Sequence, residues 1–472
     1  MLLFCAFAPH SIAGAEISLA IAAGGWLTRS IASRETGLRH TRFDLPICLF
    51  FIWTVASCFL SEEPGISIAK IQSTCVVFLF YLTHAIVTRR TAVWLVAVII
   101  LSGVAGTAFS LYDLARGRGI VIEAISRESP LPLLKIETGD AIWRVGGTRI
   151  RSVAEIDQII KASPVGTSLR ISVISRGEHL ERPGLIVTEA MRERASPSGI
   201  IGNRATHRFR ASGWTRHYST YAEILQFLVQ LAFGIALANF ANHRFNLWAK
   251  LSFVATALLA LGVALTAMRT VLIAVTFGVC VISFRSLTAK ARTISLVGLL
   301  ILLAVGVFVV SQTRARDALW LGDDSSSLRV QVARVGINRI TQHPVFGHGM
   351  DAMQRHWNEW GFPGADMLHL HSTPLQLAFD RGLPALVFWL WIIWIFWRTA
   401  ADGEKSLRDS SDTNRFGLLL GASGAVAGFF ASSMVNYNFG DGEVALVFWW
   451  LAGVLVVLKT DKPTPNRLAS NG

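Results

Sequence analysis

Long apolar runs, separated by short polar loops, dominate the chain of 472 residues. A helix needs about 20 apolar residues to cross the hydrocarbon core of a bilayer. Runs near this length predict spanning helices over 12–28, 45–60, 66–88, 91–113, 219–241, 247–266, 270–284, 293–311, 374–397, 415–434 and 441–458. One more follows if residues 2–11 form half of a broken hairpin. The pattern therefore predicts a polytopic α-helical membrane protein with about 11–12 transmembrane helices.

Lysine and arginine recur in alternate short loops between these helices. The basic loops are 29–42, 89–90, 244–250, 285–292, 398–415 and 459–467. The opposite short loops, 61–65 and 436–443, contain neither residue. Because basic loops of membrane proteins face the cytoplasm, the long segments 114–218 and 312–373 are expected on the extracytoplasmic face. No ATP is present there, so any transfer reaction needs a donor that is already activated.

The composition agrees with a membrane protein. Hydrophobic residues make up 52% of the chain and charged residues only 16%, which is too apolar for a typical soluble enzyme. Basic loops that face anionic phospholipid explain the net charge of +13, and nucleic acid is not expected as a partner. The five cysteines lie in apolar stretches without a CxxC pair, which argues against a disulfide framework or a zinc site.

Residues 117–190 form a more polar insert with short alternating strands and one helix. Gly146 and Gly147 suit a tight hairpin turn, and Ser152 with Glu155 suits a capping box for the helix over 152–163. The insert resembles a PDZ domain of the bacterial protease type, which implies a small α+β fold. It is expected either to bind the end of a peptide or envelope protein as an added strand or to serve as a spacer, and no catalytic role is assigned to it.

Four other stretches carry a second resemblance. They read ASGWTRHYSTYAEILQFL (211–228), LTAMRTVLIAV (265–275), SLRVQVARVGINRITQHPVFGHGMDAM (327–353) and HLHSTPLQLAFDRGLPALVFWL (369–390). In this order between apolar spans, they resemble the O-antigen ligase and polymerase family of bacterial envelope glycan enzymes. HPVFGHG fits that family's Pro-x-x-Gly-x-Gly turn, and 369–390 fits its His-x-His-Asn pattern, with Ser372 in place of the Asn. The resemblance covers the whole chain except the insert.

This resemblance implies a GT-C-like fold in the bacterial inner membrane, with the active site facing the periplasm. It implies a metal-independent, inverting glycosyltransferase without a cofactor, which takes a saccharide from a polyprenyl-diphosphate-linked glycan donor. The acceptor hydroxyl is expected on lipid A core, on a growing glycan or on a protein. These acceptors correspond to a ligase, a polymerase and a protein O-oligosaccharyltransferase, and the sequence does not separate them.

Arg269 and Arg329 are the candidates that would hold the donor's diphosphate. Departure of a diphosphate needs neutralisation of charge, and a guanidinium is always cationic and pairs bidentately with phosphate oxygens. The position of Arg329 matches the family pattern. Arg269 is expected near the outer end of a membrane helix, where a charge is costly unless it is paired or lines a wet cavity. The alternative for Arg269 is that it reaches the lipid headgroups.

His371 is the candidate base, because the acceptor hydroxyl must lose a proton and imidazole titrates near neutral pH. His371 aligns with the histidine that precedes Asn in the family, and His369 is the second candidate, as a substrate-binding residue. A metal held by both is the alternative, but no carboxylate or cysteine cluster completes a ligand set nearby. A helix-capping role for His371 is a further alternative.

Other residues are candidates for substrate binding. Arg216 and His217 could contact phosphate or glycan. Gly347 and Gly349 allow a close approach of backbone to substrate, although a sharp turn alone explains them. Trp357 lies outside the predicted spans and is a candidate for stacking on a sugar.

These predictions divide the chain into five parts. They are N-terminal transmembrane helices (1–114), the PDZ-like periplasmic domain (115–192), central transmembrane helices (193–311), a periplasmic catalytic loop (312–373), and C-terminal helices with a cytoplasmic tail (374–472). Two other classes of function stay open, a transporter and a membrane scaffold, each with the PDZ-like domain as a regulatory or binding part.

Overall fold

The structure is a computed structural model of the chain. It describes residues 1–175, 178–206, 209–241, 247–286, isolated positions between 289 and 308, 324–364, 369–408, 410 and 412–459. Two units are distinguished. The first, called the membrane unit below, combines Met1–Thr107, Ser212–Gly306 and Leu321–Gly472, and the second, called the insert, contains Ala108–Ala211.

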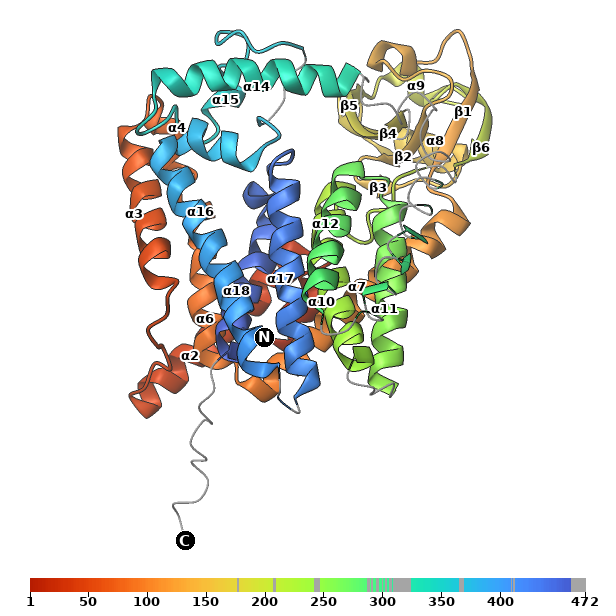
Figure 1. Ribbon diagram of the computed structural model, residues 1–472. Helices are drawn as coiled ribbons and strands as arrows, with labels where there is room; N and C mark the ends of the chain where they lie inside the picture. Colours follow the sequence, from red (N-terminus) through yellow and green to blue (C-terminus); the bar gives the residue numbers. More distant parts are fainter. Residues whose placement is uncertain are drawn as a thin grey trace. The chain divides into compact units, whose positions relative to one another are not determined.

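The membrane unit is built almost entirely of helices (Figure 1). Its N-terminal part contains α1 (Leu2–Phe7), α2 (Ile12–Ser33), α3 (Asp44–Leu60), α4 (Pro64–Ile68), α5 (Ile71–Thr74), α6 (Phe78–Ile86) and the start of α7 (Arg89–Arg116). Its central part contains α10 (Tyr218–Ala241), α11 (Leu247–Leu265) and α12 (Arg269–Arg285). Its C-terminal part contains α14 (Asp324–Gln342), α15 (Ala352–Arg355), α16 (Thr373–Leu407), α17 (Thr413–Ser433) and α18 (Gly442–Lys459).

Six helices within the described residues are long and apolar enough to span a membrane: α7, α10, α11, α16, α17 and α18. Two other apolar stretches, Asp44–Leu60 and Ile71–Ile86, are shorter. These helices fit a polytopic helical membrane protein, with fewer full-length spans than the eleven predicted. The predicted span 66–88 is divided into α4, α5, a 3-10 turn (Cys75–Val77) and α6, and the predicted span 293–311 lies outside the continuously described residues.

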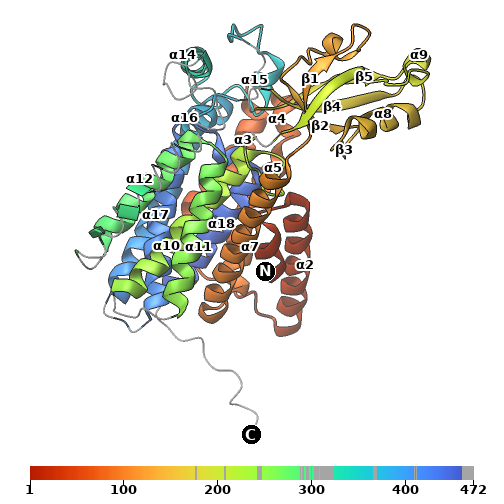
Figure 2. The same ribbon diagram turned by 90° about the vertical axis from the view of Figure 1, so that its right-hand side faces the viewer.

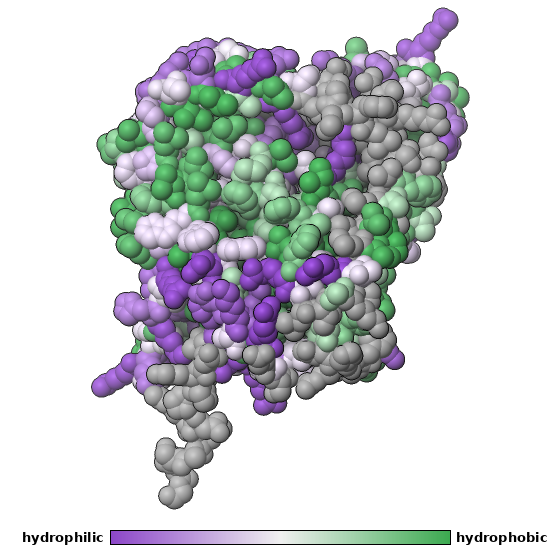
Figure 3. All heavy atoms as spheres, in the orientation of Figure 1, coloured by the Kyte–Doolittle hydropathy of each residue, from purple (hydrophilic) through white to green (hydrophobic). Residues whose placement is uncertain are grey.

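Hydrophobic side chains remain on the outside of the bundle. On the face in Figure 3, they gather over α3 and α16, between hydrophilic zones above and below. On α3, Ile52 and Phe59 are 58% and 57% exposed, and on α16, Val387 and Trp394 are 58% and 55% exposed. Such a band would be costly in water over so large a contiguous area, so it indicates a lipid-facing surface.

The centre of the bundle is formed by α10 and α17, which pack closely. A Cβ atom added at Gly234 of α10 would lie 2.4 Å from the carbonyl oxygen of Gly417 and 2.6 Å from Cα of Gly421. Small residues of this kind let two membrane helices approach each other. The buried amide of Gln226 also donates to the carbonyl of Ala425 on α17, over 3.1 Å. These contacts hold the two helices in a fixed register.

Helix α16 is kinked at Gly382, whose φ of 80° and ψ of 170° are not helical. A Cβ there would lie 1.8 Å from the carbonyl oxygen of Val345, so only glycine fits. Leu383 N donates to Pro344 O over 2.8 Å, which ties the kink to the loop that follows α14. In Figure 1, α14 crosses the end of the bundle at which α16 begins.

The insert contains an antiparallel sheet in the order β5-β4-β2-β1-β6, with β3 paired to β2. The strands are β1 (Ile120–Ile125), β2 (Ala141–Val145), β3 (Thr148–Arg149), β4 (Ser168–Ser175), β5 (Glu178–Ile186) and β6 (Ile200–Ala205). Helix α8 (Val153–Ala162) lies along one face of the sheet (Figure 2) and buries Ile156 and Ile160 in the core of the insert.

Two local predictions for the insert are confirmed. Gly146 and Gly147, at the turn between β2 and β3, have φ angles of 57° and 86°. Ser152 caps α8, since its hydroxyl accepts from Glu155 N over 3.3 Å. The Glu155 carboxylate accepts from Arg151 N, one residue earlier than in a strict capping box. The PDZ-like identity of the insert itself stays a prediction.

Candidate functional site

The two histidines of the candidate site lie immediately before α16. The ring centroids of His369 and His371 are 4.5 Å apart. His371 has a φ of 52°, a left-handed conformation that costs a non-glycine residue about 1–3 kcal/mol and persists where the surroundings impose it. Two hydrogen bonds flank it, from Leu370 N to Gln376 Oε1 (2.6 Å) and from Thr373 N to Asn436 O (3.0 Å). These two hydrogen bonds hold the strained backbone on both sides of His371.

Both histidines are neutral near neutral pH. Burial, followed by the charge of Arg329, lowers the pKa of His369 to about 4. Burial, followed by the neighbouring His369 and the charge of Arg329, lowers the pKa of His371 to about 3. Each ring thus keeps a nitrogen lone pair that can accept a proton, although such a low pKa means a weak base in the free protein.

Arg329 brings a positive charge to this pair from α14. Its side chain is half-buried, and within the described part of the chain its buried Nε atom has no hydrogen-bond partner. A buried guanidinium N–H without a partner is costly, and an anion would satisfy it. Arg329 thus brings an unused cationic donor close to two neutral acceptors.

Arg269 is the first residue of α12, directly after Ala267 (φ 52°) and Met268. The neighbouring Thr270 accepts a hydrogen bond from Asn436 Nδ2 over 2.9 Å. The backbone carbonyl of the same Asn436 accepts from Thr373, as described above. Arg269 is thus linked to the start of α16 through one shared residue, Asn436.

Glu223 of α10 is a functional candidate that the sequence reasoning missed. It is 3% exposed, and its carboxylate accepts hydrogen bonds from Asn436 Nδ2 (3.0 Å), Ser432 Oγ (2.9 Å) and Asn438 Nδ2 (3.3 Å). Since Asn436 contacts both Thr270 and Thr373, Glu223 holds the starts of α12 and α16 together. A carboxylate in the apolar stretch YAEILQFL was the available signal, because charges within membrane helices usually have a specific role.

The other predicted residues lie in less direct positions. Arg216 and His217 are exposed in the segment before α10. Gly347 and Gly349 have φ angles of 71° and 109°. An added Cβ would lie 2.6 Å from Arg381 N at Gly347 and 2.3 Å from Ser67 Oγ at Gly349. Positive φ angles and close contact with the backbone of α16 at Gly347 and with the side chain of Ser67 at Gly349 thus explain both glycines without a substrate.

Trp357 is 3% exposed and belongs to a hydrophobic cluster between α14 and α16. Its ring stacks on Phe362, with centroids 4.9 Å apart. With only 3% of the residue exposed, the ring has almost no surface open to a sugar in this structure. Ser372 is the N-cap residue of α16, and its side chain makes no capping hydrogen bond to the helix.

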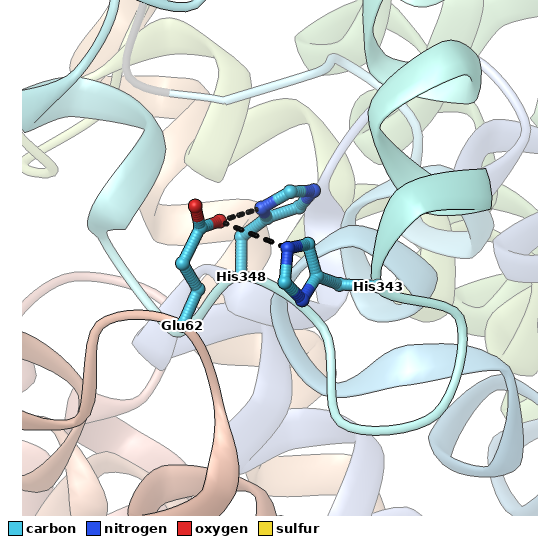
Figure 4. Close-up of side chains that lie close together, drawn as sticks. All are labelled: Glu62, His343 and His348. Atoms are coloured by element: carbon cyan, nitrogen blue, oxygen red, sulfur yellow. Dashed lines mark hydrogen bonds and ion pairs between the residues drawn. The ribbon is translucent and has the colours of Figure 1, made fainter.

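A second histidine group lies at Glu62, His343 and His348 (Figure 4). Each of these three residues offers one ligand atom, and the three atoms lie within 4.8 Å of one another. Among the described residues, this is the group that is close enough together to hold a metal ion. Partial burial disfavours the charge of Glu62, but the hydrogen bond with His348 and the nearby positive charges outweigh this and lower the pKa of Glu62.

Comparison with known protein families gives a match over part of the chain. Residues 254–390 match the family model described as O-antigen ligase. The match begins within α11 and ends within α16, so it includes Arg269, Arg329, His369 and His371. A search of curated proteins found no match. The helices indicate a multi-pass membrane protein. The match over 254–390 to the O-antigen ligase family supports a glycosyltransferase-like ligase or polymerase.

Proposed function

We propose that the chain is a glycosyltransferase that moves a saccharide from a polyprenyl-diphosphate carrier to a hydroxyl acceptor, with lipid A core as the acceptor in a ligase reaction. The observation that carries this proposal is the unpartnered Nε of Arg329 beside two neutral imidazoles. An anion-binding group next to a proton acceptor is what the reaction needs, because its leaving group is an anion and its nucleophile is a hydroxyl.

The reaction proceeds by displacement at the anomeric carbon. Arg329 and Arg269 bind oxygens of the diphosphate, which leaves with the electron pair of the carbon–oxygen bond. The acceptor oxygen forms the new bond on the opposite face, which inverts the anomeric configuration. His371 takes the proton of that hydroxyl, and His369 orients the donor or the acceptor.

Donor binding also makes His371 a better base. In the free protein, the cation of Arg329 contributes to the low pKa of His371. A bound diphosphate neutralises that cation and adds negative charge, and nearby negative charge raises the pKa of an imidazole. The base therefore gains strength only when the donor is in place, which limits proton abstraction without transfer.

The transfer step itself is proposed to use no metal. A carboxylate or thiol that could complete a ligand set with His369 and His371 is not found close to them in the described segments. Two guanidiniums take the place that a divalent cation has in many diphosphate sites.

The site is proposed to face the periplasm. His371 lies before the first residue of α16, and two basic residues of this helix, Arg398 and Lys405, lie toward its other end. There, Asp402 accepts from Arg42 over 2.9 Å and from Lys459 over 3.1 Å. Basic residues from three segments are thus gathered at one end of α16, as expected for the cytoplasmic end in the inner membrane.

The test is direct reconstitution. The purified chain is incubated with a lipid-linked oligosaccharide and with lipid A core, the oligosaccharide alone or a protein acceptor, and the products are analysed by mass. Oligosaccharide on lipid A core supports the ligase, doubled carrier-linked glycan indicates a polymerase, and glycosylated protein indicates an oligosaccharyltransferase. Flux of the carrier or glycan across proteoliposomes without any new glycosidic bond would show a transporter instead.

A further inference from the structure

Two loops at the end of the membrane unit are joined through Glu62, which follows α3. Glu62 N donates to Gly347 O over 3.3 Å, and Glu63 N donates to His348 O over 3.1 Å. The side chain of Glu62 then reaches two histidines of the other loop (Figure 4). Its Oε2 atom lies within hydrogen-bond distance of Nδ1 of His348 and 3.7 Å from Nε2 of His343. One carboxylate oxygen and two ring nitrogens thus converge on one point.

The orientation of His348 is fixed by its surroundings. The side chain has no exposed surface, and its ring packs against Phe379 and Trp360 with centroids 4.6 and 5.0 Å away. Its Nε2 atom lies 2.9 Å from the backbone oxygen of Arg339. A carbonyl oxygen can only accept, so Nε2 carries the hydrogen. In the neutral ring, Nδ1 therefore directs a lone pair at the carboxylate of Glu62.

Two electron-rich atoms at this close distance, one of them on a fully buried ring, need a cation between them. The cation is either a proton or a metal ion. His343 favours the metal, since it adds a third ligand atom that a simple imidazolium–carboxylate pair does not require. The guanidinium of Arg339 does not satisfy Glu62, because it lies over the ring of Trp360 at 5.3 Å and donates to Gln342 Oε1 at 3.1 Å.

We propose that Glu62 Oε2, His343 Nε2 and His348 Nδ1 bind one divalent transition-metal ion of the zinc type, with water as the fourth ligand. Zinc takes imidazole nitrogen and carboxylate oxygen at about 2.0–2.2 Å, which separates tetrahedral ligand atoms by roughly 3.4 Å. The observed 3.7 Å between Glu62 and His343 is close to that value. The contact of Glu62 with His348 has to open to admit the ion, and Glu62 is a third exposed on a loop.

The hydrogen bond from His348 Nε2 to the backbone oxygen fits this assignment independently. Metal-binding histidines usually donate their second N–H to a carbonyl or carboxylate, which fixes the ring orientation. The ion would fasten the end of α3 to the loop after α14, the helix that carries Arg329. That loop is itself bound to α16, through His348 N to Phe379 O (2.7 Å) and Gly349 N to Asp380 O (3.0 Å).

The experiment uses the full chain, purified in detergent with its affinity tag removed and stripped of metal with EDTA. Zinc is titrated in competition with a chromophoric chelator, and thermal unfolding is followed with and without zinc. We expect one tightly bound ion per chain and a rise of the unfolding midpoint of roughly 3–6 °C at saturating zinc. Cobalt substituted at the site should give the absorption of a tetrahedral ion.

Variants assign the binding to these residues. Glu62→Gln and His343→Gln should each weaken zinc binding at least about tenfold. His343 is 43% exposed, so its variant tests the site even if His348→Gln does not fold. The matched control is His356→Gln, which removes another histidine between glutamates. The ring nitrogens of His356 face separate carboxylates, Glu63 at 2.9 Å and Glu359 at 2.6 Å, so they do not converge on one ion.

Zinc affinity that is equal in the wild type, Glu62→Gln and His343→Gln would overturn the proposal. So would the absence of stoichiometric binding together with an unfolding midpoint that does not respond to zinc. In that case the contact is an imidazolium–carboxylate pair. These readouts are metal content and stability, so they do not depend on the transfer reaction.

Discussion

Two histidine groups in the membrane unit have opposite electrostatic surroundings. His369 and His371 are buried beside the cation Arg329, and both remain neutral because burial, followed by this charge, lowers their pKa. They have no carboxylate within ion-pair distance among the described residues. His343 and His348 share the carboxylate of Glu62. The first environment attracts an anion and leaves a free proton acceptor, whereas the second attracts a cation. The neighbours of an imidazole, more than the imidazole itself, thus decide its chemistry.

The largest expected effect is on kcat, and it comes from replacing the candidate base in the first histidine group. Replacing His371 with Ala should lower kcat about 10²–10⁴-fold, because a positioned base contributes that much, with little change in the thermal midpoint. His356→Ala, outside both groups, should keep its activity. The rate of transfer from a lipid-linked donor to the acceptor is the measurement. Wild-type kcat in a folded His371→Ala protein would exclude this residue as the base.

A second substitution tests whether Arg329 contacts the diphosphate of the donor. Arg329→Lys keeps the charge but loses the planar, bidentate geometry, so kcat/KM for the donor should fall roughly 10–100-fold. Arg334→Lys is the matched control, because this arginine lies on the same helix and is exposed. Equal donor kinetics in the two variants would mean that Arg329 does not contact the diphosphate.

The sequence predicted the two groups unequally. His369, His371 and Arg329 were chosen from motif and chemistry, and the structure places the charge of Arg329 close to both rings. Glu62 and His348 are 286 residues apart in the chain, and no periodic pattern relates positions at that distance. The histidines of HPVFGHG were therefore visible in the sequence, but their carboxylate partner was not.

Helices were predictable where apolar runs had no alternative structure. The span over 66–88 failed because Lys70 and the polar residues after it interrupt the run. The structure breaks the helix there, and Lys70 pairs with Asp351 over 2.6 Å. The kink of α16 was also not predicted, since it depends on the approach of Val345 to Gly382, which is a tertiary contact.

A third substitution tests whether Glu223 positions the first histidine group, His369 and His371. Glu223→Gln keeps the shape but puts an amide donor where three donors now converge, which should cost about 1–3 kcal/mol of stability. Because the starts of α12 and α16 share Asn436, kcat should fall roughly tenfold from misplacement of the catalytic groups, while KM for the acceptor changes less. Asn239→Ala, at the other end of α10, is the control. A loss of stability with unchanged kcat would leave Glu223 as a structural residue only.

The smallest effect is on the pH profile, and its sign follows from the low pKa of His371. The unfolded chain binds a proton at this residue below about pH 6.5, whereas the folded protein does so only near pH 3. Lowering the pH through this window therefore reduces stability, because the unfolded state binds more protons.

For catalysis, kcat/KM reports the free enzyme and kcat the donor complex. Since a bound diphosphate raises the pKa of His371, the acidic limb of kcat should lie at higher pH than that of kcat/KM. Coinciding limbs would show that the donor's charge does not reach this imidazole, and Arg329→Gln should move the limb of kcat/KM upward by removing a charge that now opposes protonation.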